Sequence, residues 1–212
     1  MLCRSRFAAI SCVLLASCLS AAIGRSDEPA SKARPANWAV KLDRPGLPNL
    51  YKLNDGLYRG AQPTAEGIRE LEKLGVKTII CLRANHPDKD ILGDAKIAVE
   101  DIPMKTWDPK DEQVVRFLRI VADKNRRPVF VHCQHGADRT GTMCAAYRVV
   151  VQGWTKQQAI DEMKDGGFGF HSIWINLPKY IEKLDVEKIK AKLTSTLRAA
   201  AESVSAGPRG SP

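Results

Sequence analysis

The feature that most constrains this chain is the string VFVHCQHGADRTG, which runs from Val129 to Gly141. An apolar run, a polar loop and helix-forming residues in that order predict a strand, a tight turn and the start of a helix. The five residues between Cys133 and Arg139 are enough chain to curl around one tetrahedral anion. Backbone N–H groups and the positive end of the helix dipole would face that anion. The string therefore predicts an anion cradle that contains a cysteine.

Cys133 and Arg139 supply the chemistry of this cradle. A cysteine is a nucleophile as the thiolate, and backbone amides, an arginine and a helix N-terminus all favour that form. The planar guanidinium of Arg139 can bind two phosphoryl oxygens and hold them as charge shifts in the transition state. Lysine has the same charge but no planar fork, so we expect it to fail at this position. These two residues predict phosphoryl transfer through Cys133.

Neighbouring residues have supporting roles in this prediction. The expected phosphate-binding residues are Gln134, His135, Gly136, Ala137, Asp138 and Arg139. We expect Thr140 to donate a hydrogen bond to the cysteine sulfur and His132 to orient the loop by hydrogen bonding. Gly136 would turn the backbone where a side chain would face the anion, and Gly141 would let the following helix approach closely. Asp138 is expected to point away from the anion and to fix neighbouring amides.

The string HCQHGADRTG resembles the HCxxGxxR[ST]G signature of the protein tyrosine and dual-specificity phosphatases. The segment GLYRGAQPTAEGIRELEKLGVKTIICLR also resembles the opening of compact bacterial and atypical dual-specificity phosphatases, so the likeness spans about residues 49 to 184. The resemblance implies the fold of that family, a two-step reaction through a phosphocysteine, no cofactor and no metal. It also implies a general acid on a loop before the cysteine, which protonates the leaving oxygen.

Three aspartates compete for the role of general acid. Asp108 lies in the loop MKTWDPKD, 25 residues before Cys133, and is the favoured candidate. Asp101 is its rival, but it falls within a predicted strand. Asp111 precedes a predicted helix and is typical of a helix cap. The plain alternative for each is a solvated surface carboxylate, which is the commonest fate of an aspartate.

Hydrophobic periodicity predicts an α/β fold with a mainly parallel central sheet flanked by helices, the dual-specificity phosphatase fold that the resemblance implies. Asp55-Gly56 predicts a hairpin, and Thr64 is expected to cap a helix that stops at Gly75. Further strands are expected in VKTIICL, from Ile97 to Ile102 and in PVFVH. Further helices are expected over Glu112 to Lys124, Thr140 to Gln152, after Thr155 and from Ile173 to Leu193. The loops at the carboxyl ends of the strands should carry the site.

The first residues have the pattern of an export signal. Arg4 and Arg6 precede the uncharged apolar run Phe7 to Leu19, which is too short to span a membrane. Ser20-Ala21-Ala22 and Ala22-Ile23-Gly24 offer small residues for ordinary cleavage. Residues 15–18, LASC, instead resemble the bacterial lipoprotein signal, which would make Cys18 a lipidated first residue. Both interpretations stay open. The expected location is the periplasm or cell envelope, with membrane contact only through a lipid anchor.

The expected organisation is a signal peptide over 1–23, a flexible linker over 24–37, a phosphatase domain over 38–194 and a partly disordered tail over 195–212. The formal net charge is +9, and +7 without the two arginines of the signal, which favours anionic partners.

Only Cys81, Cys133 and Cys144 remain in the domain, too few for a disulfide framework. Cys144 should pack in the core. Cys81 should do the same, although a reversible disulfide with Cys133 is an alternative.

These observations predict a phosphoric monoester hydrolase that acts on a phosphorylated protein, with phosphotyrosine as the first substrate class. An inositol phosphate or another small phosphoester is the alternative, and no nucleic acid is expected. Phosphoinositide-directed relatives tend to carry lysines where this loop has Gln134, His135 and Asp138, so highly anionic head groups are less favoured. A phosphate-binding module without catalysis is a hypothesis of another class. A thiol redox protein ranks last, because no Cys-x-x-Cys pair is present.

Overall fold

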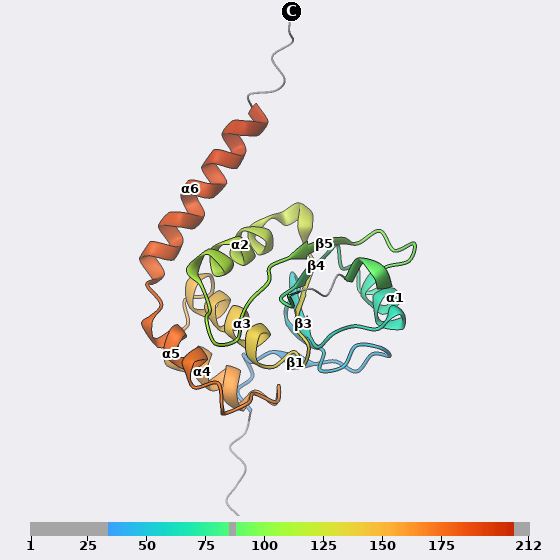
Figure 1. Ribbon diagram of the computed structural model, residues 1–212, viewed down its shortest axis with the longest axis horizontal. Helices are drawn as coiled ribbons and strands as arrows, with labels where there is room; N and C mark the ends of the chain where they lie inside the picture. The colour runs from blue at the N-terminus through green and yellow to red at the C-terminus, as the bar shows by residue number, and fades with distance from the viewer. Residues whose placement is uncertain (1–33, 85–87, 206–212) are drawn as a thin grey trace, which may run out of the picture. The chain divides into compact units, whose positions relative to one another are not determined.

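The computed structural model describes residues 34–84 and 88–205. The predicted signal peptide, Cys18 and most of the expected linker lie outside these residues. Within them, strands and helices alternate as the hydrophobic pattern predicts (Figure 1). No helix in this part of the chain is long and apolar enough to cross a membrane.

A sheet with the strand order β1-β2-β3-β6-β4-β5 forms the centre of the described residues. Its strands are β1 (Val40–Lys41), β2 (Tyr51–Asn54), β3 (Leu57–Gly60), β4 (Thr78–Cys81), β5 (Ala98–Asp101) and β6 (Val129–His132). β1, β2 and β3 pair antiparallel, and the turn between β2 and β3 is the hairpin predicted at Asp55-Gly56. β3, β6, β4 and β5 are parallel, so their carboxyl ends meet at one edge of the sheet.

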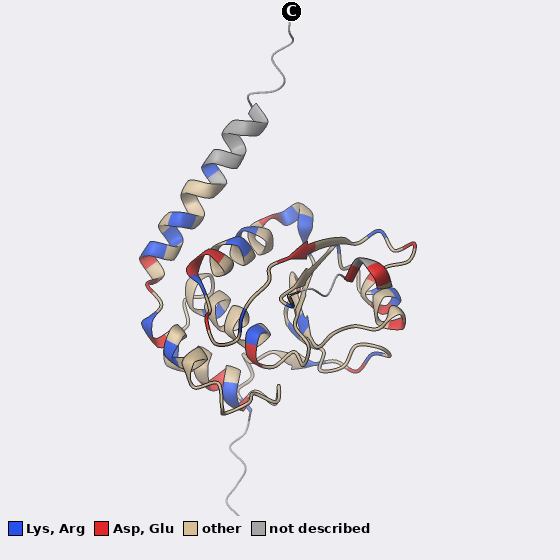
Figure 2. Ribbon diagram, viewed as in Figure 1, with Lys and Arg blue, Asp and Glu red and all other residues tan. Residues whose placement is uncertain are grey.

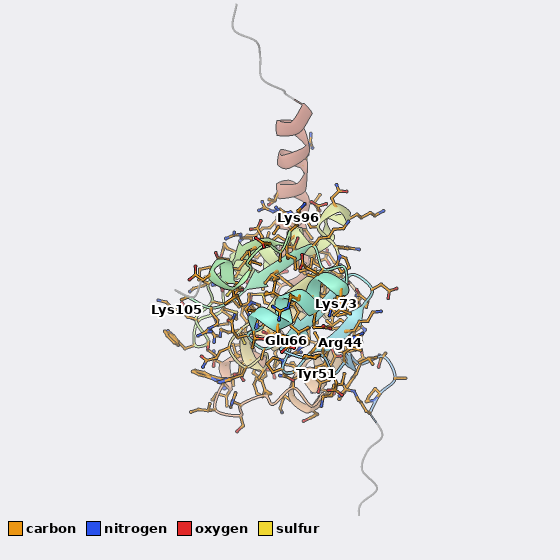
Figure 3. The ribbon with its side chains drawn as sticks, turned by 90° about the vertical axis from the view of Figure 1, so that its right-hand side faces the viewer. Arg44, Tyr51, Glu66, Lys73, Lys96 and Lys105 are labelled. Atoms are coloured by element: carbon orange, nitrogen blue, oxygen red, sulfur yellow. The ribbon has the colours of Figure 1, made fainter. Side chains whose placement is uncertain are left out.

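Helices cover both faces of this sheet (Figure 1). They are α1 (Ala65–Lys73), α2 (Asp111–Ala122), α3 (Asp138–Val150), α4 (Lys156–Asp165), α5 (Asn176–Lys183) and α6 (Val186–Ser205), with short 3₁₀ helices at Asp88–Ile91 (η1) and Lys124–Arg126 (η2). α1 lies on one face, with η1 on the same side, toward the viewer in Figure 3. Side chains alternate along β6, so Phe130 packs on the α1 side while Val129 and Val131 join the larger core on the other side.

Capping residues begin two helices where the sequence predicts them. The Thr64 hydroxyl accepts a hydrogen bond from the backbone N–H of Gly67 at 3.2 Å, and α1 ends one residue before Leu74 and two before Gly75. Thr155 caps α4 through a reciprocal pair of bonds with Gln158. These local signals satisfy N–H groups that the first turn of a helix leaves without a partner.

Several helix boundaries differ from the prediction, and α3 for example spans Asp138–Val150 rather than Thr140 to Gln152. α2 begins at Asp111 itself, so Asp111 is not the cap. Its carboxylate instead accepts hydrogen bonds from the Tyr180 hydroxyl at 3.1 Å and Lys188 Nζ at 2.9 Å, which join α2 to α5 and α6. The helix predicted from Ile173 to Leu193 is two helices, because Leu184 turns inward into the core and Asp185 caps the next helix by accepting from the Lys188 N–H. α6 then continues through residues 195–205 of the expected tail.

The end of the expected linker lies against the domain. Arg34 donates hydrogen bonds to the carbonyl oxygens of Ala39 and Gly166. Its guanidinium also lies 5.5 Å from the ring of Tyr51 and 5.7 Å from the ring of Phe168. Cation–π contacts of this kind attract an arginine to aromatic faces. Residue 34 therefore belongs with the domain rather than with a separate segment.

α3 is the central helix of the domain, since every one of its residues except Arg139 is buried. Within this core, Arg148 donates to both carboxylate oxygens of Glu162 on α4, at 2.7 and 2.6 Å. Glu162 also accepts a hydrogen bond from the backbone N–H of Ala39 at 2.6 Å. A buried ion pair is tolerated when its geometry is good and its remaining hydrogen bonds are satisfied. The pair fixes α4 and the start of the domain against α3.

Removal of Glu162 should therefore destabilise the domain strongly. We expect Glu162→Ala to lower the free energy of unfolding by about 3–5 kcal/mol, because Arg148 would keep a buried charge with no counterion. Urea denaturation followed by circular dichroism measures this change. Glu187→Ala is the matched control, since its ion pair with Lys190 involves a carboxylate that is 82% exposed. Equal effects of the two substitutions would contradict this account.

Candidate active site

The loop of residues 133–137, the candidate catalytic loop, joins β6 to α3 at the carboxyl edge of the parallel strands. Cys133 is buried at its start, while Gln134 and His135 are exposed. Ala137 precedes the first residue of α3 and makes no side-chain capping bond. The first N–H groups of α3 therefore have no acceptor from a capping side chain and are available to an anion. The strand, loop and helix start are those that the sequence predicts.

Gly136 turns this loop, but for a reason that differs from the prediction. Its φ of +70° lies in the left-handed region that favours glycine. A Cβ at this position would lie 2.4 Å from the backbone carbon of Gly60 at the end of β3. The glycine is therefore required because the loop packs directly on the backbone of β3, rather than because a side chain would face the anion.

Arg139 lies in the first turn of α3 and is partly exposed. Its Nη1 donates to the carbonyl oxygen of Leu82 at 3.5 Å, and the same oxygen accepts from the N–H of Met104 at 3.2 Å. Leu82 follows β4, and Met104 lies in the loop after β5. The guanidinium therefore reaches across the edge of the sheet to the loop that carries Asp108.

Arg59 on β3 is a site residue that sequence reasoning missed. Its side chain is only 1% exposed, and Nη2 donates to the carbonyl oxygen of Gly136 at 2.6 Å and of Ala137 at 3.4 Å. The guanidinium also lies 3.6 Å from the ring centre of Phe168. Burial lowers the pKa of Arg59, and nearby groups, among them Cys133, oppose this shift. The signal in the sequence was an arginine within the second strand of the predicted hairpin, and the structure shows that every position of this strand is buried.

No carboxylate of the described residues forms an ion pair with Arg59. Glu162 is the acidic residue that acts on it electrostatically, and both of its oxygens are bonded to Arg148. The Nε of Arg59 has no hydrogen-bond partner in this part of the chain. Arg59 is thus a buried positive charge whose hydrogen bonds go to the carbonyl oxygens of Gly136 and Ala137 in the catalytic loop.

His132 and Asp88 form a second buried support for the loop. Nδ1 of His132 lies 3.2 Å from the carbonyl oxygen of Cys133, and Nε2 lies 2.6 Å from a carboxylate oxygen of Asp88. Gln62 donates to the other Asp88 oxygen at 2.6 Å and accepts from Arg83 at 3.1 Å. Burial raises the pKa of Asp88, but the hydrogen bonds from His132 and Gln62 outweigh it and leave the pKa lowered. His132 thus makes the orienting contact expected of it, and Asp88 is a second residue that sequence reasoning missed.

Cys81 lies beside this pair rather than beside Cys133. Donor atoms of Cys81, Asp88 and His132 lie within 4.8 Å of one another, which is a set that could ligate a metal. The 2.6 Å hydrogen bond between Asp88 and His132 occupies the space between them, so an ion would have to separate the two. Burial raises the pKa of the Cys81 thiol to about 12. A thiol that resists ionisation is a poor partner for thiol–disulfide exchange, which favours the core role over the disulfide.

Two other sequence predictions concern the start of α3. Thr140 Oγ1 is buried and has no hydrogen-bond partner among the described residues, so its predicted bond to the Cys133 sulfur is not formed in this structure. Cys144 packs in the core as predicted, and burial raises the pKa of its thiol to about 11.

Asp138 holds a neighbouring segment through a backbone amide and a histidine side chain. Its two carboxylate oxygens accept hydrogen bonds from the backbone N–H and from Nδ1 of His171, at 2.9 and 2.8 Å. The His135 and His171 rings are 5.5 Å apart. Asp138 therefore ties the segment of residues 166–175 to the start of α3, and the amide that it holds is that of His171.

Asp108 and Asp101 both lie at the carboxyl edge of the sheet. Asp101 is the last residue of β5, as predicted, and pairs in register with Cys81. Asp108 closes a turn in which its N–H donates to Lys105 at 3.1 Å, and its half-exposed carboxylate lies 2.6 Å from Lys110 Nζ. Neither carboxylate has a hydrogen bond to the catalytic loop in the described residues. Asp108 stays the predicted acid, because a side chain on an exposed turn can move to a leaving group more readily than one on a strand.

Comparison with known proteins identifies the family. Residues 36–174 match the family described as DSP-PTPase phosphatase fused to NAD+ kinase. The dual specificity protein phosphatase TpbA of Pseudomonas aeruginosa is 37% identical over 169 residues, which cover 79% of this chain and 76% of TpbA. The crystal structure of a TpbA cysteine-to-serine variant with phosphotyrosine superposes with a TM-score of 0.69 at 36% identity, covering 76% of this chain and 98% of that one.

A more distant relative is an inositol diphosphatase of Arabidopsis thaliana, 26% identical over 158 residues that cover 70% of this chain and 76% of the relative. The match to TpbA agrees with the fold of the described residues, which has helices on a sheet with a parallel core. It also agrees with the loop from Cys133 to Arg139. This chain belongs to the dual-specificity family of cysteine-dependent phosphatases.

Proposed function

We propose that this chain hydrolyses phosphotyrosine in proteins, and phosphoserine or phosphothreonine as further substrates. The main support for the proposal is the arrangement of the catalytic loop. Cys133 is buried at its start, Arg139 lies in the first turn of α3, and Arg59 donates a hydrogen bond to the carbonyl oxygen of Gly136. The TpbA variant that was crystallised with phosphotyrosine is similar over 98% of its crystallised chain, and this supports the same substrate class here.

The proposed reaction has two steps. In the first, the Cys133 thiolate attacks phosphorus, an S–P bond forms, the O–P bond breaks, and Asp108 protonates the leaving oxygen. In the second, Asp108 takes a proton from water, the water oxygen attacks phosphorus, and the S–P bond breaks to release inorganic phosphate and the thiolate. Arg139 binds two phosphoryl oxygens throughout.

Arg59 contributes by orienting the peptide groups of the loop. In a planar trans peptide the C=O and the N–H point in opposite directions. The carbonyl groups of Gly136 and Ala137 point back at Arg59, so the N–H groups of Ala137 and Asp138 point away from it. Donors that are oriented before the substrate binds stabilise a phosphoryl group without a reorganisation cost. The buried charge of Arg59 adds to this effect, since no carboxylate in the described residues neutralises it.

An inositol phosphate remains the second candidate substrate, because the Arabidopsis relative is an inositol diphosphatase. The exposed part of the catalytic loop argues against it. Gln134 and His135 provide no fixed positive charge, and the carboxylate of Asp138 is engaged with His171. A substrate with several phosphates would find Arg139 as the one lysine or arginine side chain between residues 133 and 139.

Replacement of the nucleophile tests the function directly. We expect Cys133→Ser to lower kcat for para-nitrophenyl phosphate and for a phosphotyrosyl peptide by at least about 10³-fold while binding of the peptide survives. Steady-state kinetics under reducing conditions with a chelator present measure the rate, and calorimetry measures the binding. Cys144→Ala, a change at a buried cysteine of the core, is the control and should keep most of the activity. A folded wild-type protein that binds phosphotyrosine without turnover would favour the phosphate-binding module.

The general acid can be identified from the leaving group. We expect Asp108→Asn to slow hydrolysis of phosphotyrosine by about 10²-fold or more, because the tyrosine oxygen leaves poorly without a proton. The loss should be much smaller for para-nitrophenyl phosphate, whose leaving group is stable as an anion. Asp101→Asn is the matched comparison. A loss that depends on the leaving group in Asp101→Asn, and not in Asp108→Asn, would assign the acid to Asp101.

The role of Arg59 predicts a loss of anion binding. We expect Arg59→Met to weaken competitive inhibition by inorganic phosphate, and to lower kcat/KM, by roughly 10- to 100-fold, which corresponds to the loss of a hydrogen bond from a charged donor. Arg59→Lys should recover part of this effect, since it keeps the charge but not the planar fork. Thermal unfolding of each variant separates a loss of stability from a loss of binding. Unchanged inhibition by phosphate in a folded Arg59→Met protein would show that the residue has no part in the cradle.

A further inference from the structure

Large apolar side chains are exposed at five positions of the described residues: Val40, Trp107, Val151, Ile173 and Ile175. Trp107, Ile173 and Ile175 are the most exposed of them, at 67%, 77% and 63%. Single apolar residues on a surface are ordinary, whereas several gathered beside a binding site mark an interaction surface. Trp107, Ile173 and Ile175 would form such a surface if they lie together beside the catalytic loop.

Hydrogen bonds place the two segments that carry them beside each other and beside the catalytic loop. Nδ2 of Asn176, next to Ile175, donates to the carbonyl oxygen of Thr106, next to Trp107, at 2.8 Å. The segment with Ile173 is tied to the catalytic loop through His171 and Asp138, at 2.8 Å between Nδ1 and the carboxylate.

A second set of hydrogen bonds places the turn with Trp107 close to Arg139. Leu82 accepts hydrogen bonds from both Arg139 and Met104, and Met104 immediately precedes the turn of residues 105–108. Residues 105–108 and 171–175 thus border the catalytic loop and are joined to each other.

Both segments hold their exposed side chains on a fixed backbone. Phe168 is buried, and Phe170 and Trp174 pack against the core, whereas Ile173 and Ile175 on either side of Trp174 are exposed. The N–H of Trp174 donates to His171 at 3.0 Å, which closes a turn around Ile173. A surface that is already ordered before a partner binds loses little conformational entropy on binding.

The chemical character of these segments favours a peptide over an inositol phosphate as the partner. Residues 166–175 contain no charged side chain and are tan throughout in Figure 2. Lys105, labelled at the margin of the molecule in Figure 3, lies 6.0 Å from the ring centre of Trp107. An inositol ring that carries several phosphates has little apolar area to offer such a surface. A peptide can place a phosphotyrosine in the cradle and apolar side chains beside it.

We propose that Trp107, Ile173 and Ile175 form an apolar shelf that binds apolar side chains next to the phosphotyrosine of a protein substrate. This proposal depends on the proposed function and adds substrate selection to it. The cradle would recognise the phosphoryl group, and the shelf would recognise the sequence around it. Selection through such a surface raises the affinity for one peptide over another without changing the chemistry at phosphorus.

Two phosphotyrosyl peptides of equal length and charge test the shelf, one with leucine and isoleucine on both sides of the phosphotyrosine and one with serine and glycine. We expect the wild type to prefer the apolar peptide by roughly tenfold in kcat/KM, mainly through KM. Ile173→Ser/Ile175→Ser should reduce this preference to near one. Val151→Ser, at an exposed valine of the α3 C-cap, should keep the preference of the wild type.

The outcomes separate the shelf from the proposed function. Turnover of both peptides with equal kcat/KM in the wild type, or a preference that survives Ile173→Ser/Ile175→Ser, would overturn the shelf and leave the phosphatase activity intact. Absence of turnover of either peptide and of para-nitrophenyl phosphate by the folded wild type would overturn the proposed function itself.

Discussion

The site depends first on the contact between Arg59 and the carbonyl oxygens of the catalytic loop. A loop that presents its N–H groups to an anion must turn its carbonyl groups the other way, and buried carbonyl groups need donors. Arg59 provides that donor from the neighbouring strand β3, and it brings a positive charge into a place where charge is costly. The cost is tolerated because the aromatic face of Phe168 and the loop carbonyls surround the guanidinium.

The sheet carries one support for the catalytic loop on each of its faces. On the α1 side, Asp88 and His132 hold the backbone at Cys133. On the other side, Arg59 lies under Gly136 and Ala137, and the pair of Arg148 and Glu162 fixes α3 within the core. Because His132 and Cys133 are consecutive, their side chains point to opposite faces. Cys133, the proposed nucleophile, is therefore packed on one face, while His132, which contacts its backbone, is packed on the other.

The surface around the cradle differs in character from the cradle. The cradle consists of backbone N–H groups and arginine, which recognise a phosphoryl group by charge and hydrogen bonds. The neighbouring segments present Trp107, Ile173 and Ile175, whose exposed surfaces are mainly apolar. Asp138 links the two parts, since it begins α3 and also holds His171. A catalytic loop shared by a whole family can in this way serve different substrates through the segments that border it.

The sequence by itself determined the parts whose cause is local. Cys133 and Arg139, the hairpin at Asp55-Gly56 and the cap at Thr64 each depend on residues within a few positions, so the spacing in the chain was enough to predict them. Their family signature also predicted the fold. Local patterns were less reliable at Asp111 and Leu184, where contacts with other helices decide which residue begins or ends a helix.

Only the tertiary structure decided the rest. Arg59 lies 77 residues from Gly136, Asp88 lies 44 from His132, and Asp138 lies 33 from His171. Periodicity indicates that a side chain is buried, but not which distant group it meets. The roles of Arg59, Asp88 and Asp138 therefore depended on the way the strands and loops assemble at one edge of the sheet.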